Sequence, residues 1–321
     1  MVNAKTLPIE SQVIRVIFDG DTASGVVFKA NIEHQPEAKD ASVRTVRARK
    51  SVVVACGALG TPPLLERSGL GDPEILKKAG VPMIASIPGV GHQYEDHHLL
   101  TYSYKTALNP GETVDAILQG RIDPGELIKQ NDKILGWNAQ DVTCKLRPAD
   151  NEVATLGPEF QAAWDRDFKN TPTKPLMLMT LINGYPGDPS GIPPGQYLGL
   201  SAFSPYPYSR GHVHITGPEL SDPLDFETGF FSDTHDIDLK KHVWAYKTQR
   251  EFMRRMETYR GEVASLHPPF PPQSDAACIE INGPLGDVSD IHYTDEDDAI
   301  IEKWLREHVG STWHSRSAPV K

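Results

Sequence analysis

The chain has 321 residues, of which 39% are hydrophobic, with 32 Lys and Arg against 43 Asp and Glu, for a net charge of −11. This length suffices for one large or two ordinary domains with a buried core, and the composition excludes a chain that is disordered throughout. The acidic balance disfavours nucleic acid and anionic membranes as partners, because both repel a negative protein.

Targeting and cysteine patterns are consistent with an intracellular protein. Residues 1–8 lack the apolar core of a secretion signal, and no apolar run is long enough to cross a bilayer. The three cysteines, Cys56, Cys144 and Cys278, are odd in number and widely spaced, so they form neither a disulfide framework nor a Cys-x-x-Cys metal site. We therefore expect a reducing compartment and no membrane anchor.

The first fifty residues alternate between apolar and polar side chains. Residues 13–18, 25–28 and 43–48 are predicted to form an antiparallel meander. Residues 51–55 are a continuous Ser-Val-Val-Val-Ala run, which is typical of a strand buried on both faces in a parallel sheet. This run ends in a turn of small residues, 56–60.

Two short helices are predicted after that turn. A Thr-Pro pair at 61–62 indicates a helix start, and Gly69 is a plausible stop. An Asp-Pro pair at 72–73 indicates a second helix over 74–79, with Gly80 as the left-handed residue that ends it. A strand, a glycine turn and a helix are thus expected in succession.

The remaining signals are weaker until the last third of the chain. Further elements are predicted as helices at 114–118, 158–168 and 236–259, strands at 175–182 and 211–216, and a helix that opens at Thr294. In the strand at 211–216, Val213 and Ile215 share one face, and we expect His212 and His214 to lie on an exposed face.

Residues 56–71, with the sequence CGALGTPPLLERSGLG, resemble the second signature of the glucose-methanol-choline (GMC) flavin oxidoreductases. Small residues there would let the backbone approach a planar cofactor, although an ordinary strand-to-helix turn explains the same residues without a ligand. Three further blocks, 88–97, 208–215 and 311–315, resemble family segments and occur in the family's order. The resemblance covers nearly the whole chain and is greatest to the fungal alcohol (methanol) oxidases.

The resemblance implies an α/β plus α+β fold, the remnant of a Rossmann-like FAD domain with an antiparallel-sheet substrate domain. Residues 1–90 would be a partial FAD-binding domain and 91–290 the substrate-binding domain. Residues 291–321 would return to the FAD domain with the active-site block.

The resemblance also implies a chemistry. His314 would accept the hydroxyl proton of a small primary alcohol while hydride passes to flavin N5, and O2 would reoxidise the flavin to give H2O2. Val13, Cys56, Gly57 and Trp313 match positions expected to contact FAD. The family also makes the peroxisome a candidate compartment.

The chain departs from the family pattern in two places. It has no Gly-x-Gly-x-x-Gly turn to hold a pyrophosphate, and it stops at Lys321 without the family's second catalytic His or Asn. We therefore expect a partial chain that binds FAD weakly or not at all and is inactive alone. The alternative is a non-catalytic remnant or assembly partner, as a homo-oligomer or in association with full-length relatives.

One cluster of metal-ligand residue types occurs, at His92, Asp96, His97 and His98. Imidazole and carboxylate groups are common metal ligands. No other Cys or His segment has spacing that would complete a site, so we favour a surface or interdomain loop and expect no metal.

Overall fold

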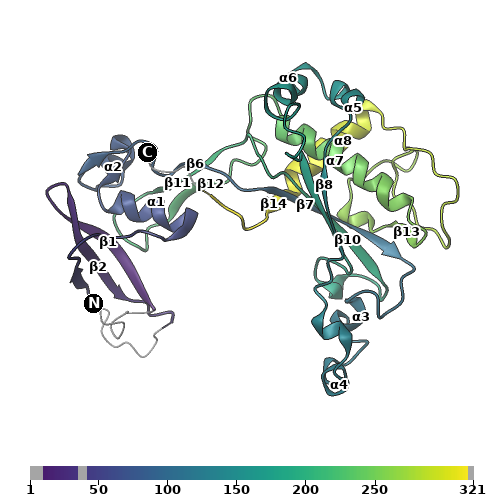
Figure 1. Ribbon diagram of the computed structural model, residues 1–321, viewed down its shortest axis with the longest axis horizontal. Coiled ribbons are helices and arrows are strands. Elements are labelled where there is room, and N and C mark those ends of the chain that lie inside the picture. Colours follow the sequence, from purple (N-terminus) through teal and green to yellow (C-terminus); the bar gives the residue numbers. More distant parts are fainter. Residues whose placement is uncertain (1–9, 35–41, 317–321) are drawn as a thin grey trace. The chain divides into compact units, whose positions relative to one another are not determined.

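The computed structural model describes residues 10–34 and 42–316, and the chain divides into two compact units (Figure 1). Unit 1 comprises residues 1–96, 210–229 and 314–321, and unit 2 comprises residues 97–209 and 230–313. The expected mixed α/β class with antiparallel sheets is confirmed. The assignment of roles to residues 1–90, 91–290 and 291–321 stays a prediction.

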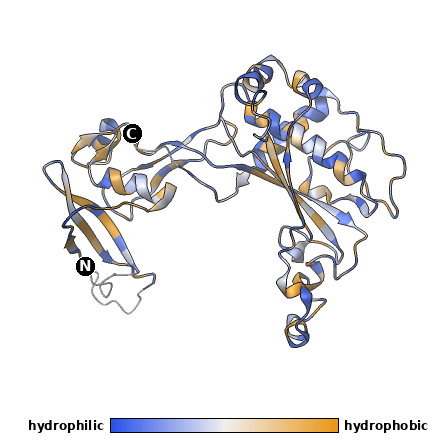
Figure 2. Cartoon of the chain, viewed as in Figure 1, coloured by the Kyte–Doolittle hydropathy of each residue, from blue (hydrophilic) through white to orange (hydrophobic). Residues whose placement is uncertain are grey.

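The predicted meander is present in unit 1. It consists of β1 (Ser11–Asp19), β2 (Thr22–Ala30) and β3 (Arg44–Arg47), which are antiparallel in that order. Hydrophobic residues of β1 and β2 are coloured orange in Figure 2, and Val16 and Val27 are buried. The Val16 amide donates to Ser68 Oγ at 2.8 Å, which ties β1 to the helix that precedes Ser68.

That helix, α1 (Gly57–Arg67), begins earlier than predicted. The predicted start at Thr61 is wrong, because the small residues before it continue the helix and the Thr61 hydroxyl accepts from the Cys56 amide at 3.2 Å. The predicted stop is confirmed at Gly69, which has φ +85° and lies against the Pro82 carbonyl with no room for a side chain.

The predicted strand at 51–55 is absent, and this prediction is wrong. The Val53 residue is 84% exposed instead of buried on two faces. A strand forms where a neighbouring strand pairs with its backbone N–H and C=O groups, and no strand among the described residues pairs with this segment.

The rest of unit 1 contains the predicted helix α2 (Pro73–Lys78), whose cap Asp72 accepts from the Glu74 amide at 2.8 Å. Two short sheets complete the unit: β4 (Leu70–Gly71) runs parallel to β5 (Ala85–Ser86), and β11 (Gly211–Ile215) lies between β12 (Leu224–Glu227) and β6 (His92–Tyr94). A small core joins α2 to β11 through Leu76, Ala79, Val81 and Ile215.

Unit 2 is built on an antiparallel sheet in the order β13-β7-β10-β9-β8, with β14 also paired to β7. Its strands are β7 (His98–Thr106), β8 (Val142–Leu146), β9 (Met177–Ile182), β10 (Tyr197–Phe203), β13 (Tyr259–Glu262) and β14 (Gly310–Ser311). The strands predicted at 175–182 and 211–216 are therefore confirmed as β9 and β11.

Four helices contribute buried residues to one core with this sheet, which includes the aromatic Tyr102, Tyr104, Tyr246 and Trp304. They are α5 (Asp150–Thr155), α6 (Pro158–Asp167), α7 (Ile237–Arg254) and α8 (Asp295–His308). Unit 2 also contains α3 (Asp115–Leu118), α4 (Pro124–Gln130) and the 3-10 turns η2 (Lys133–Gly136), η3 (Pro189–Gly191) and η4 (Ala264–Leu266). The α8 start is confirmed as a reciprocal cap between Thr294 and Asp297. Across residues 10–34 and 42–316, no helix is long and apolar enough to cross a membrane.

Candidate active site

The structure places four of the five residues expected at the site in unit 1. Val13 lies on β1 and is 36% exposed, whereas Cys56 caps the start of α1 and Gly57 is its first residue. His314 lies in the exposed segment that returns to unit 1, and Trp313 ends unit 2 with 86% of its surface exposed.

The start of α1 fits one wall of a dinucleotide site. Gly57 has φ +74°, and a Cβ built there would meet nothing within 4 Å, so a ligand could approach the backbone closely. The Cys56 side chain makes no cap hydrogen bond to the amides of the first turn. Helix amides of this kind are suited to an anionic group.

The cradle for a pyrophosphate is not formed by the described residues. The sole parallel pairing among them is the two-residue ladder of β4 and β5, and the sequence has no Gly-x-Gly-x-x-Gly turn. The described residues therefore offer a helix start that an anionic group could approach, without the glycine-rich turn that a dinucleotide site of this class uses.

The backbone around His314 is held by an acidic segment. Asp96 Oδ1 accepts from the His314 amide at 3.2 Å, and Asp96 Oδ2 accepts from the Ser315 hydroxyl at 3.1 Å. Tyr94 contributes a hydroxyl at 2.8 Å from Ser315 Oγ. Because Asp96 and Tyr94 are buried, the segment bearing His314 is fixed against the interior of unit 1.

Glu95, which precedes Asp96 in the chain, also binds the segment that contains His314. Its backbone forms a two-way antiparallel bridge with Arg316, with both N···O distances 2.9 Å. Its buried carboxylate pairs with Arg210 at 2.7 Å and also contacts the Arg316 guanidinium. Sequence reasoning missed Tyr94, Glu95 and Asp96 as partners of residues 314–316, although all three lie in the 88–97 block that carries the resemblance.

A second polar cluster in unit 1 corrects the prediction for β11. His214 is buried, and its Nδ1 lies 2.7 Å from Glu66 Oε1, while Glu66 Oε2 accepts from the Ile215 amide at 2.8 Å. The expectation that both β11 histidines line an exposed face is wrong for His214, because the fully buried Glu66 requires a hydrogen-bond donor. The neighbouring His92 has its pKa lowered, chiefly by burial and then by His214.

Gly91 makes the close approach of this cluster possible. It has φ +77°, and a side chain there would overlap the Val213 carbonyl oxygen and the His214 ring. We expect Gly91→Ala to lower the free energy of unfolding by about 2 kcal/mol, from left-handed strain and overpacking. Chemical denaturation measures the loss. The matched control is Gly89→Ala, where a Cβ meets nothing within 4 Å, and equal losses in the two variants would contradict the argument.

The metal cluster considered from the sequence does not form. Among the residues that the structure describes, no group of three or more His, Cys, Asp and Glu side chains could hold a metal ion. His98 has other partners, since its Nε2 accepts from the Phe231 amide at 3.1 Å and its Nδ1 therefore donates to Ser204 Oγ, also at 3.1 Å.

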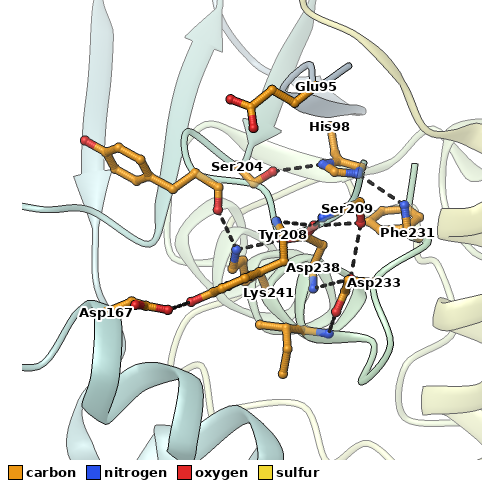
Figure 3. Close-up of polar contacts among 12 residues, drawn as sticks. Glu95, His98, Asp167, Ser204, Tyr208, Ser209, Phe231, Asp233, Asp238 and Lys241 are labelled. Carbon is orange, nitrogen blue, oxygen red and sulfur yellow. Dashed lines mark hydrogen bonds and ion pairs between the residues drawn. The ribbon is translucent and has the colours of Figure 1, made fainter. Parts of the chain in front are cut away.

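Figure 3 shows His98 beside a buried ionic network in unit 2. Asp238 and Lys241 are fully buried, with Asp238 Oδ1 2.7 Å from Lys241 Nζ. Asp238 Oδ2 accepts from the Tyr208 amide, the Ser209 amide and the Ser209 hydroxyl at 2.7–2.8 Å. Although burial alone would raise the pKa of Asp238, Lys241 and these hydrogen bonds lower it well below its usual range. The network fixes the loop between β10 and β11 on the first turn of α7.

Sequence comparison with known proteins finds relatives in one family. The family profile described as GMC oxidoreductase matches residues 3–99. The alcohol oxidase of Candida boidinii is 33% identical over 96% of this chain and 52% of its own length, and alcohol oxidase 1 of Komagataella phaffii is 34% identical over 86% and 48%. The chain thus spans about half the length of the curated relatives that it matches.

Solved structures agree on the fold. A formate oxidase has a TM-score of 0.72 at 16% identity, covering 95% of this chain and 50% of its own. An FAD-dependent oxidoreductase from Chaetomium thermophilum has a TM-score of 0.68 at 19% identity, covering 95% and 51%.

Proposed function

This chain belongs to the GMC oxidoreductase family, whose members are FAD-dependent flavoenzymes, and we propose that it takes part in oxidising a primary alcohol to an aldehyde with O2 as acceptor. The names of its curated relatives support an alcohol as the substrate class. We place it inside the cell, with the peroxisome as the compartment that the family resemblance suggests.

We assign His314 as the group that accepts the hydroxyl proton. The observation that carries this role is the anchoring of the His314 amide on buried Asp96 while the residue itself stays exposed. A neutral imidazole has a ring nitrogen that can accept a proton from an alcohol hydroxyl. Bound FAD would supply the hydride acceptor. We assign Val13, Cys56, Gly57 and Trp313 to the cofactor wall.

We further propose that the chain binds FAD weakly by itself, because it presents one wall of the site without a pyrophosphate cradle. The flavin would then be held jointly with a glycine-rich βαβ segment of the kind that precedes the matched region in GMC oxidoreductases. Either a longer polypeptide or a separate chain could supply that segment.

Complementation tests this function. The chain is expressed together with the parts of Candida boidinii alcohol oxidase that lie on either side of the matched region, because the second catalytic His or Asn of the family lies beyond it. We expect these polypeptides to purify together with a flavin absorption spectrum and to release peroxide when methanol is added. His314→Gln should reduce peroxide release at least 100-fold at unchanged flavin content, because general-base catalysis contributes about 10²–10⁴-fold. His235→Gln, at an exposed histidine of unit 2, should not change the rate.

The second candidate is a non-catalytic assembly partner, and the unpaired segment at 51–55 favours it. The Val53 side chain is 84% exposed and would be covered by a neighbouring strand, whereas Val52 and Val54 are half-buried. In the same experiment, a complex that binds flavin without releasing peroxide would support assembly and exclude catalysis. Failure to form any complex would exclude association through this segment.

A further inference from the structure

Unit 2 contains a cavity of about 820 Å³ for which the proposed oxidation has no use. Its wall comes from residues 108–112 after β7, residues 122–141 around α4 and η2, and Asn183 after β9 (Figure 1). The volume is typical of small-molecule sites, which span about 300–1,000 Å³. Strand β7 runs from His98, which pairs with Ser311, to Thr106, so the cavity lies about 25 Å along the strand from that pairing.

The indole and amide hydrogen-bond donors of this wall are used by its own carboxylates. Asp141 accepts from Trp137 Nε1 at 2.7 Å and from Asn183 Nδ2 at 3.0 Å. Glu112 Oε2 accepts from the backbone and side-chain nitrogens of Asn109 at 2.7 and 2.8 Å. The indole and both amides are thereby held in place.

The wall has acceptors left over. Asn183 is nine-tenths buried, and its Oδ1 has no hydrogen-bond partner. The Asn183 amide cannot be reversed, because the Asp141 carboxylate accepts and does not donate. Asp132 uses Oδ1 to accept from the Ile134 amide at 2.9 Å, and its charge adds to those of Glu112 and Asp141. The wall therefore contains three carboxylates and one lysine, Lys133, and has a net negative charge.

The remainder of the wall is apolar and partly buried. It consists of the Trp137 indole and the aliphatic side chains of Leu108, Ile122, Leu127 and Ile134. The unused acceptors and the net negative charge of the wall favour a ligand with a cationic hydrogen-bond donor. The indole and the aliphatic side chains favour a ligand whose remaining part is apolar. We propose that this cavity binds an organic ammonium ion with an aromatic or branched apolar body.

An isosteric series tests the proposal on the purified chain. Phenethylamine, 2-phenylethanol and phenylacetate share one body and carry an ammonium, a hydroxyl and a carboxylate. Binding is followed by the NMR signal of the Trp137 indole N–H, assigned with Trp137→Phe. We expect phenethylamine to shift this signal, and the other two to bind at least tenfold more weakly. Equal binding of 2-phenylethanol, or no shift with phenethylamine, would overturn the proposal.

Two charge-removing variants test the recognition. Glu112→Gln and Asp132→Asn keep an oxygen that accepts the same amide hydrogen bonds, so the wall should keep its shape. We expect each to weaken phenethylamine binding about threefold, as for a partly exposed ion pair, and added salt to weaken it further. Glu126→Gln, whose carboxylate pairs with Lys129 outside the cavity wall, is the control. Unchanged affinity in both cavity variants would refute recognition of the positive charge.

Discussion

Asp238→Ala is expected to lower the free energy of unfolding of unit 2 by about 3–5 kcal/mol. The substitution removes the carboxylate that neutralises the fully buried Lys241, which keeps one other acceptor, the Tyr206 carbonyl at 2.9 Å. It also leaves the amides of Tyr208 and Ser209 without the acceptor that they share. Chemical denaturation followed by circular dichroism measures the loss.

Two controls separate this effect from general damage. Glu126→Ala breaks the exposed pair with Lys129, which is worth well under about 1 kcal/mol. The double variant Asp238→Leu, Lys241→Met removes both buried charges. It should have a higher free energy of unfolding than Asp238→Ala, because it leaves no buried charge without a partner. If Asp238→Ala and Glu126→Ala cost the same, the buried network does not stabilise unit 2 as argued.

Acidification from pH 6.5 to about pH 4 is expected to destabilise unit 2 by about 3 kcal/mol through His267. This imidazole is 2% exposed, and burial lowers its pKa to about 4. Between pH 6.5 and pH 4, His267 binds a proton in the unfolded chain, where its pKa is near 6.5, but stays neutral in the folded chain. The free energy of unfolding therefore falls as the pH falls. His242, also fully buried with its pKa lowered well below the usual value by burial, acts in the same direction.

His267→Gln tests the assignment. The imidazole lies with Nε2 3.0 Å from the Ser103 carbonyl and Nδ1 3.3 Å from the Tyr246 hydroxyl, and a glutamine amide can donate to the first and accept from the second. Unfolding free energies of the variant at pH 7 and pH 4.5 should differ less than those of the unsubstituted chain. His235→Gln should keep the full pH dependence. A His267→Gln variant that is as acid-sensitive as the unsubstituted chain would rule out His267 as the cause.

Elements with local signals were predictable from the sequence. The start of α8 follows from Thr294 and Asp297, three residues apart, and α2 follows from Asp72 and the proline after it. These caps form within one helical turn, so neighbouring residues contain the necessary information. The β1 and β2 strands of the meander were predictable because a tight turn after Asp19 brings two neighbouring apolar segments together.

The predictions that were wrong or incomplete concern features that depend on residues far away in the sequence. Residues 51–55 have the composition of a buried strand, but a strand forms only where a partner offers backbone hydrogen bonds. His214 is buried because Glu66, 148 positions earlier, needs a donor. Asp96 reaches the His314 amide across 218 positions. The pattern of residue types over a few neighbouring positions does not indicate which distant residues will form such pairs.

The order in which the chain contributes to its two units has a consequence for biosynthesis. Unit 1 draws on three separate segments, and the last of them begins at His314, after every residue of unit 2. Domains generally fold as units while the chain emerges from the ribosome. The buried Asp96 and Glu95 therefore lack their partners at residues 314–316 until every residue of unit 2 has been made. Premature termination before His314 should release a chain with a folded unit 2 and an incomplete unit 1.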